Sequence, residues 1–130
     1  MYHNKTILIT GGSSGLGRNL AKQYAKNGGR IINISRDVLK MESLQNKLNQ
    51  INSYKHLYFS ADVSKYSEIN EIKNVLAKKE IYPDVVINNA AGNFLCPFNK
   101  LSENGWRRII DIVLNGSFNI YHIFGKYLID

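Results

Sequence analysis

The chain has 130 residues, of which 44% are hydrophobic and 21% are charged, so it has the size and composition of one folded globular domain. Its 17 basic and 10 acidic residues give a net charge of +7, but the lysines are dispersed and form no basic stripe or nucleic-acid-binding motif, so we expect an anionic small molecule and no nucleic acid as partner. No apolar run reaches the roughly 18 residues that cross a bilayer, so we expect no membrane span.

Strands and helices alternate through the first half of the chain. Residues 5–10 (KTILIT) predict a short buried strand that ends in glycines, and apolar residues then recur at helical spacing from residue 15 to about residue 27. Residues 30–35 (RIINIS) predict a second strand, followed by a helix with Asp37 as N-cap that reaches about residue 52. Residues 56–60 predict a third strand.

The same alternation continues in the second half. Ser64 or Ser67 is the expected start of a helix that ends before Pro83, and residues 84–88 predict a fourth strand. Ser102 is the expected N-cap of a long helix that runs to the end of the chain. Because residues 103–130 are apolar nearly all round the helix, we expect burial on more than one side, by the sheet and by a partner subunit.

This βαβ alternation predicts an α/β fold with a doubly wound parallel sheet, right-handed crossovers and strand order 3-2-1-4 over residues 1–130. In such sheets a ligand binds at the carboxyl ends of the strands, here near the switch between strands 1 and 4.

Cysteine and histidine content bears on the compartment and on metals. A single cysteine, Cys96, excludes an internal disulfide and favours a reducing, cytoplasmic setting. The three histidines lack the spacing of metal ligands, so we expect no metal site. A strand is predicted within a few residues of the N-terminus, which leaves no room for a signal or transit peptide.

A glycine-rich turn joins the first strand to the first helix. Glycine permits a tight turn and a close approach of the backbone to a phosphate, and the helix N-terminus offers unpaired N–H groups and partial positive charge. A plain glycine-serine loop is the alternative, but the strand-turn-helix context predicts a dinucleotide site. Its predicted binding residues are Gly11, Gly12, Ser13, Ser14, Gly15, Leu16 and Gly17.

The spacing T-G-x-x-x-G-x-G at residues 10–17 resembles the short-chain dehydrogenase/reductase family, which has a Rossmann-type fold. N-N-A-A-G at residues 88–92 matches the N-N-A-G segment of that family, and Asp62-Val63 matches its adenine-contacting pair. The resemblance covers essentially the whole chain. It implies that the cofactor site also includes Asp62, Val63, Asn89, Ala90 and Gly92; amides that merely cap a turn are the alternative at residues 88 and 89.

The end of the second strand indicates which nicotinamide cofactor is used. An NAD enzyme usually has an acidic residue there to bind the ribose 2′-hydroxyl, whereas this chain has Ser35 and Arg36. A guanidinium and a hydroxyl suit a 2′-phosphate, and Asp37 is assigned to the helix cap. We therefore expect NADPH, bound in part by Arg36; a surface arginine without this role is the alternative.

Within the family, residues 87–94 (INNAAGNF), followed by a proline, by LS and GW, and by IDIVLNG at residues 110–116, resemble the 2,4-dienoyl-CoA reductases. The resemblance implies that Asn93 is catalytic and hydrogen-bonds the thioester carbonyl of an acyl-CoA substrate, which Phe94 and Ser102 also contact. The alternatives are a turn residue for Asn93 and a core residue for Phe94. Most family members have an Asn in N-x-x-G where this chain has Val113, and Ser64 replaces an arginine of the mammalian mitochondrial dienoyl-CoA reductases.

The Tyr-x-x-x-Lys motif of the family is absent, because none of the 8 tyrosines has a lysine four residues later. We therefore expect the chain to be the N-terminal half of a reductase, truncated after the helix that follows strand 4 and inactive by itself. The alternatives are an enoyl-CoA or 3-oxoacyl reductase, the latter disfavoured by Val113, and a non-catalytic nucleotide-binding fragment. The resemblance also implies a homo-oligomer in the full-length family, with residues 103–130 in the interface.

Overall fold

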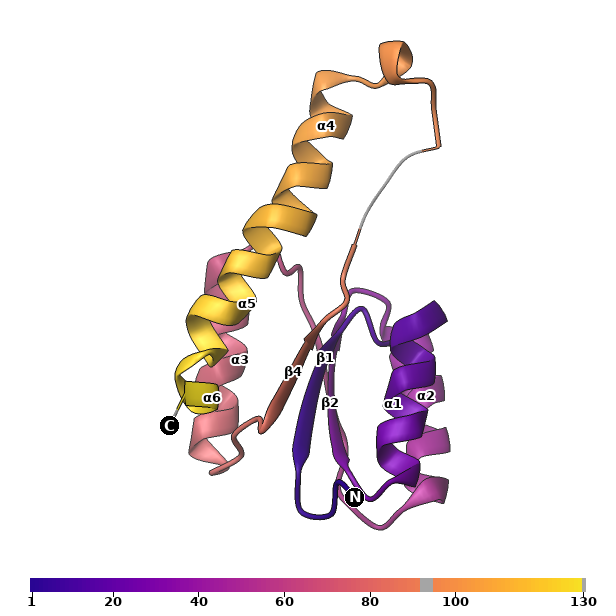
Figure 1. Ribbon diagram of the computed structural model, residues 1–130, viewed down its shortest axis with the longest axis vertical. Helices are drawn as coiled ribbons and strands as arrows, with labels where there is room; N and C mark the ends of the chain where they lie inside the picture. Colours follow the sequence, from indigo (N-terminus) through magenta and orange to yellow (C-terminus); the bar gives the residue numbers. More distant parts are fainter. Residues whose placement is uncertain (92–94, 130) are drawn as a thin grey trace.

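The computed structural model describes residues 1–91 and 95–129. Four strands form one sheet in the order β3-β2-β1-β4, every pairing in it is parallel, and the predicted order 3-2-1-4 is therefore confirmed (Figure 1). In chain order the elements are β1 (Thr6–Thr10), α1 (Gly15–Lys26), β2 (Arg30–Ser35), α2 (Val38–Ile51), β3 (Leu57–Ser60), α3 (Tyr66–Lys78), β4 (Val85–Asn88), the 3₁₀ turn η1 (Phe98–Lys100), α4 (Glu103–Ile110), the π-helical turn η2 (Asp111–Asn115), α5 (Gly116–Phe124) and α6 (Lys126–Ile129).

Helices cover both faces of the sheet, with α1 and α2 on one side and α3 and α5 on the other (Figure 1). Because side chains alternate along a strand, Ile7 and Ile9 of β1 pack against the first pair of helices and Leu8 packs toward the second pair. All five residues of β1 are buried, which explains why its sequence is an unbroken apolar run rather than an alternating one.

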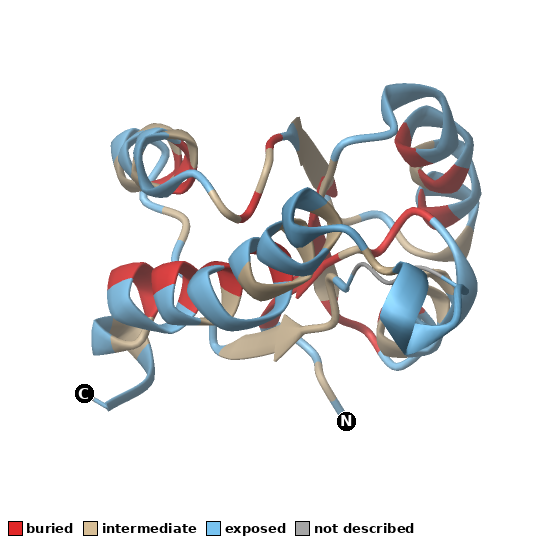
Figure 2. Cartoon of the chain, turned by 90° about the horizontal axis from the view of Figure 1, so that it is seen from above, coloured by how far each residue is buried: buried red, intermediate tan, exposed pale blue. Residues whose placement is uncertain are grey.

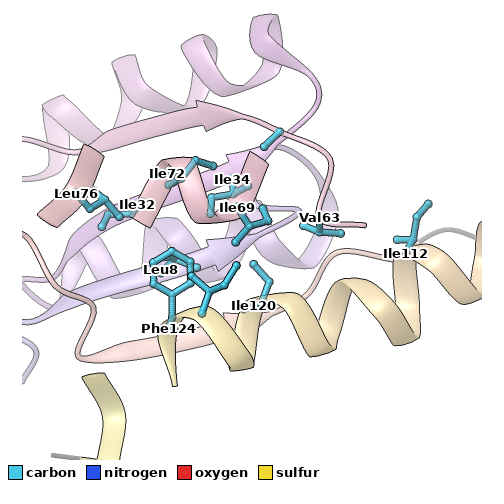
Figure 3. Packing of buried hydrophobic residues seen from close by; sticks show 12 residues of the cluster. Leu8, Ile32, Ile34, Val63, Ile69, Ile72, Leu76, Ile112, Ile120 and Phe124 are labelled. Atoms are coloured by element: carbon cyan, nitrogen blue, oxygen red, sulfur yellow. The ribbon is translucent and has the colours of Figure 1, made fainter. Parts of the chain in front are cut away.

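The core on the α3 and α5 side is the larger one and is shown in Figure 3. Ile69 of α3 and Ile120 and Phe124 of α5 are fully buried against the sheet, and Phe124 is among the largest buried side chains. This packing holds α5 against the sheet, so the helical turn that precedes it is held near the carboxyl ends of the strands.

The long C-terminal helix differs from its prediction. It is divided by η2, and only the side of α5 that faces the sheet is buried, as Figure 2 shows for the helix that leads to the C-terminus. Burial by the sheet is as predicted, and the opposite side of α5 is exposed in the single chain. Burial of that side by a partner subunit stays a prediction.

The start of α3 also differs from its prediction. The helix begins at Tyr66, and its N-cap, Lys65, makes no side-chain capping bond, so neither Ser64 nor Ser67 starts it. The loop before it is held by carboxylates instead, since Glu68 accepts a hydrogen bond from the N–H of Asp62 at 2.7 Å.

Two helix caps are as the sequence predicts. The Asp37 carboxylate accepts a hydrogen bond from the N–H of Lys40 at 3.0 Å at the start of α2. The Ser102 hydroxyl accepts one from the N–H of Gly105 at 3.0 Å at the start of α4. Among the described helices, none combines the length and the apolar character needed to cross a bilayer.

Candidate functional site

A cleft of about 350 Å³ opens at the carboxyl ends of the strands, where the fold predicts a ligand. Its walls are the segments that follow β1, β2, β3 and β4, together with Ile112 of η2. Eight of the residues predicted to bind the cofactor line it: Gly11, Ser13, Ser14, Arg36, Asp62, Val63, Asn89 and Ala90.

The other predicted residues lie beside this cleft, away from it or outside the described residues. Gly12, Gly15, Leu16 and Gly17 belong to the glycine turn and the first turn of α1 but do not line the cleft, and the Leu16 side chain is exposed. Ser102 caps the end of α4 that lies farthest from the sheet (Figure 1). Gly92, Asn93 and Phe94 lie outside the described residues.

The glycine turn has the conformation and the close contacts that its sequence indicates. Gly11 has a φ of +65°, in the left-handed region that favours glycine. Gly17 brings α1 against the carbonyl oxygen of Gly11, and a Cβ there would also lie 2.6 Å from Nδ2 of Asn89. Ser14, the N-cap of α1, lines the cleft, so the first turn of α1 begins at the edge of the cleft with the unpaired N–H groups that bind phosphate.

Asn33 of β2 contacts the glycine turn. It was not identified as a site residue from the sequence. It is 2% exposed, and its Oδ1 accepts a hydrogen bond from the N–H of Gly12 at 3.1 Å. Its Nδ2 makes no hydrogen bond within the described part of the chain. The sequence does show an Asn among the apolar residues of the strand RIINIS, which marks it as unusual. The neighbouring residues do not show that this Asn faces the glycine turn.

The amides at the end of β4 join this strand to β1 and to the glycine turn. The Thr10 hydroxyl accepts hydrogen bonds from the N–H groups of Asn89 and Ala90, each at 3.0 Å, and donates one to Oδ1 of Asn88 at 3.2 Å. Nδ2 of Asn89 donates to the carbonyl of Gly11 at 3.2 Å. The two amides therefore fix the cleft wall as well as terminating the strand.

Positive charge gathers where β2 ends. Arg36 and Lys40 are both exposed and both line the cleft. The Asp37 carboxylate, which also reaches the cleft, is engaged by the N–H of Lys40 and lies 3.7 Å from its Nζ. The Ser35 and Ser13 hydroxyls are hydrogen-bonded at 2.8 Å. Lys40 was not identified as a cleft residue from the sequence, although its spacing of four residues from Arg36 could have indicated that the two side chains lie close together.

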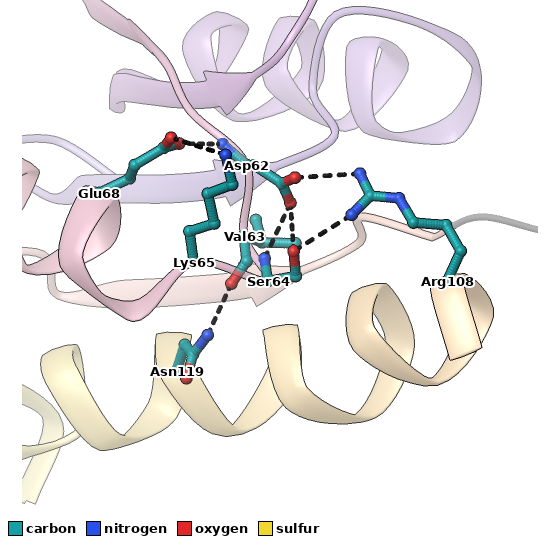
Figure 4. A network of polar contacts seen from close by, with 7 residues as sticks. All are labelled: Asp62, Val63, Ser64, Lys65, Glu68, Arg108 and Asn119. Carbon is teal, nitrogen blue, oxygen red and sulfur yellow. Dashed lines mark hydrogen bonds and ion pairs between the residues drawn. The ribbon is translucent and has the colours of Figure 1, made fainter. Parts of the chain in front are cut away.

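Asp62 presents an ionised carboxylate to the cleft (Figure 4). Oδ1 accepts from the N–H and the hydroxyl of Ser64, at 3.0 and 2.7 Å, and Oδ2 accepts from Nη2 of Arg108 at 3.0 Å. Burial opposes ionisation, but the Ser64 bonds and Arg108 outweigh it and hold the pKa of Asp62 below its usual value. Arg108 was missed, because no local pattern links positions so far apart.

The π-helical turn η2 carries Val113, the residue at which the sequence departs from the N-x-x-G pattern. The amide of Asn115 donates to Oδ1 of Asp111 at 2.9 Å on the exposed surface, so it does not take over the missing position. Nδ2 of Asn88 donates to the Ser117 hydroxyl at 2.6 Å, just after this turn. Among the residues that the structure describes, no group of three or more His, Cys, Asp or Glu could hold a metal ion.

The chain is similar to known oxidoreductases. The sequence model of the short chain dehydrogenase family matches residues 5–130. The chain is 37% identical over 128 residues to a probable 2,4-dienoyl-CoA reductase [(2E)-enoyl-CoA-producing] of Bacillus subtilis (strain 168), covering 97% of this chain and 49% of that protein. It is 34% identical over 121 residues to the NADPH-dependent pterin aldehyde reductase of Arabidopsis thaliana, covering 92% and 49%.

A solved structure agrees with these sequence matches. A short chain dehydrogenase from Bacillus anthracis superposes with a TM-score of 0.88 at 38% identity, covering 99% of this chain and 51% of that one. This chain therefore spans about half the length of the relatives that it matches.

Replacing Gly17 tests the close approach of α1 to the glycine turn. Gly→Ala in a helix usually stabilises a protein by up to about 1 kcal/mol, but Gly17→Ala should lower the free energy of unfolding by about 1–3 kcal/mol, because its Cβ overlaps the Gly11 carbonyl. Urea denaturation measures this difference. The matched control is Gly15→Asn, where a Cβ has no neighbour within 4 Å and Asn tolerates the φ of +54° better than other residues, so the loss of stability should be smaller than in Gly17→Ala. A Gly17→Ala protein as stable as the wild type would refute the contact.

Proposed function

Because this chain belongs to the short-chain dehydrogenase/reductase family of oxidoreductases, we propose that it binds NADPH and serves a reductase that acts on a 2,4-dienoyl-CoA thioester. The NADPH proposal is carried by one observation: positively charged side chains, Arg36 and Lys40, line the cleft after β2. The acidic residue between them, Asp37, caps α2. The substrate proposal is supported by 37% identity to a probable 2,4-dienoyl-CoA reductase.

We propose the following contacts between the residues around the cleft and NADPH. The N-terminus of α1 and the glycine turn, residues 11–17, would bind the pyrophosphate. Arg36 and Lys40 would bind the 2′-phosphate through charge-assisted hydrogen bonds. The Asp62 carboxylate would accept a hydrogen bond from the adenine amino group beside Val63. Asn89, Ala90 and Gly92 would lie along the ribose.

The proposed chemistry depends on stabilising an enolate. When bound, the cofactor would supply a hydride for the far end of the conjugated diene, and a proton would complete the reduction. The negative charge that would develop on the thioester oxygen in between calls for a hydrogen-bond donor from the protein. We propose that the Asn93 amide donates a hydrogen bond to this oxygen, since an amide donates without titrating. Phe94 and Ser102 would contact the acyl-CoA. The reaction would serve fatty-acid breakdown in a reducing, cytoplasmic setting, which the single cysteine favours.

Val113 disfavours the main alternative, reduction of a carbonyl group. In most members of the family an Asn at this position supports the proton relay, and Asn115 is engaged with Asp111. The identity to a pterin aldehyde reductase keeps carbonyl reduction as the second candidate. An enoyl-CoA reductase and a nucleotide-binding chain without catalysis are the remaining alternatives.

Replacing Arg36 tests the cofactor. Arg36→Leu should weaken NADPH binding about 10-fold or more, because a charge-assisted hydrogen bond contributes about 1.5–3 kcal/mol. NADH binding, measured in parallel by calorimetry, should change little, since NADH has no 2′-phosphate. Arg107→Leu is the matched control, because among the described residues Arg107 forms its ion pair with Glu103, on the exposed surface of α4. Equal losses of NADPH and NADH affinity in Arg36→Leu would argue against this role.

Replacing Asn93 tests the reaction. Because this chain spans about half the length of its relatives and is expected to be inactive by itself, turnover of a 2,4-dienoyl-CoA is followed as loss of NADPH absorbance after a complementing second half is supplied. Asn93→Ala should then lower kcat about 100-fold or more, as for removal of one oxyanion donor. A 2-enoyl-CoA, a 3-oxoacyl-CoA and an aldehyde are compared with the same enzyme. Faster turnover of any of these would replace the dienoyl-CoA proposal. NADPH binding without turnover of any substrate would favour a nucleotide-binding role.

The outward side of the long helix supports a further proposal, that a second copy of the chain covers it. Leu114 and Phe118 are 63% and 60% exposed there, and apolar surface of this kind usually marks an interface. We expect a dimer or larger assembly in sedimentation experiments and a shift toward monomer in Leu114→Asp. Leu39→Asp, on the exposed side of α2, is the matched control and should leave the assembly unchanged. A monomeric wild type would refute this proposal.

A further inference from the structure

We propose that Arg108 is a positioning residue that couples binding of adenine in the cleft to the position of α4. The inference rests on the proposed function in one respect, because it takes Asp62 as the carboxylate that meets the adenine amino group. It goes beyond that function by linking the nucleotide site to the helix that begins at Ser102.

The first step is the attachment of α4 to the rest of the fold. None of the residues of α4 is buried, and the helix extends beyond the carboxyl ends of the strands (Figure 1). Among the described residues, Arg108 makes the side-chain hydrogen bonds that join α4 to another part of the fold, to Asp62 and Ser64. Arg107 bonds Glu103 within the helix itself. The position of α4 therefore depends on its helical continuity with η2 and α5 and, among the described side chains, on Arg108.

The second step is the limited capacity of the Asp62 carboxylate. A carboxylate offers about four acceptor positions, two on each oxygen. Both positions on Oδ1 are used by Ser64, and Arg108 uses one on Oδ2. The remaining position on Oδ2 is available to an adenine amino group, so Arg108 and the adenine share one oxygen. Arg108 thereby sets the direction in which Asp62 presents its free acceptor position.

The third step is a second contact between the same loop and the long helix. Nδ2 of Asn119 in α5 donates to the carbonyl of Val63 at 2.9 Å, and Asn119 is buried (Figure 4). The side chain of Arg108, in contrast, is 35% exposed. The loop after β3 is therefore held firmly at α5 and less firmly at α4, with the π-helical turn η2 between the two contacts.

These three steps give a thermodynamic coupling. A nucleotide that fixes the Asp62 carboxylate favours the position of α4 in which Arg108 bonds it, and the same position of α4 favours nucleotide binding. Since α4 begins at Ser102, a bound nucleotide would help to order the side of the site proposed for the acyl-CoA before that substrate arrives.

The chain contains a built-in reporter for this coupling. Trp106 is the only tryptophan, lies on α4 two residues before Arg108 and is 50% exposed. Adenosine 2′,5′-bisphosphate is a suitable probe, because it carries the adenine and the 2′-phosphate but lacks the nicotinamide, whose reduced form absorbs light that tryptophan emits. Calorimetry gives its affinity, and the fluorescence anisotropy of Trp106 reports the motion of α4.

In the wild type we expect the bisphosphate to bind and to change the anisotropy of Trp106. In Arg108→Ala, affinity should fall about 5-fold or more, as expected for a coupling between sites, and the Trp106 response should disappear. Arg108→Lys should recover part of both effects, since it restores the charge. Arg107→Ala is the matched control, because it removes the same charge from the same helix and should behave as the wild type.

The outcomes separate this inference from the proposed function. If the bisphosphate binds and Arg108→Ala matches the wild type in affinity and in Trp106 response, the coupling is refuted while nucleotide binding stands. If the folded wild type binds no bisphosphate, nucleotide binding is refuted and the coupling with it. If Arg108→Ala does not fold, Asp62→Asn is measured, and a wild-type Trp106 response in that variant refutes the coupling.

Discussion

The hydroxyl of Thr10 is the interaction on which the arrangement of the cleft depends. It is completely buried at the end of the central strand β1 and bonds both the backbone and the side-chain amide of the segment that ends β4. This fixes Asn89, whose own amide bonds the carbonyl of Gly11 and so supports the glycine turn. One side chain therefore sets the distance between the two turns that enclose the cleft.

Features encoded over a few residues could be predicted from the sequence. The four strands, the Asp37 and Ser102 caps and the glycine turn each depend on neighbours in the chain. The strand order joins distant segments, and it was predicted from the type of doubly wound fold that the βαβ alternation indicates. The contacts that complete the site join distant positions instead. Asn33 bonds Gly12 across 21 residues and Arg108 bonds Asp62 across 46, and neither pairing leaves a pattern in the local sequence.

The structure shows where the charged side chains lie around the cleft. A net charge of +7 alone indicated no more than a preference for anions. In the fold, Arg36 stands at one end of the cleft beside the ion pair of Lys40 and Asp37, whereas Arg108 is paired with the Asp62 carboxylate at the wall formed after β3. The cleft is therefore polarised along its length, which suits a ligand with a phosphate at one position and a neutral base at another.

The π-helical turn η2 has a consequence for insertions and deletions. Each residue of a helix rotates the chain by about 100°, and a π turn accommodates one extra residue. A one-residue deletion within Asp111–Asn115 that restored regular helix would therefore leave α5 against the sheet and Arg108 facing Asp62. A one-residue deletion in the regular helix α5, which has no surplus residue to lose, would instead turn α4 about its axis by about 100° and point Arg108 away from Asp62. The π turn thus lets the long helix change its length by one residue without changing the orientation of α4 relative to the nucleotide cleft.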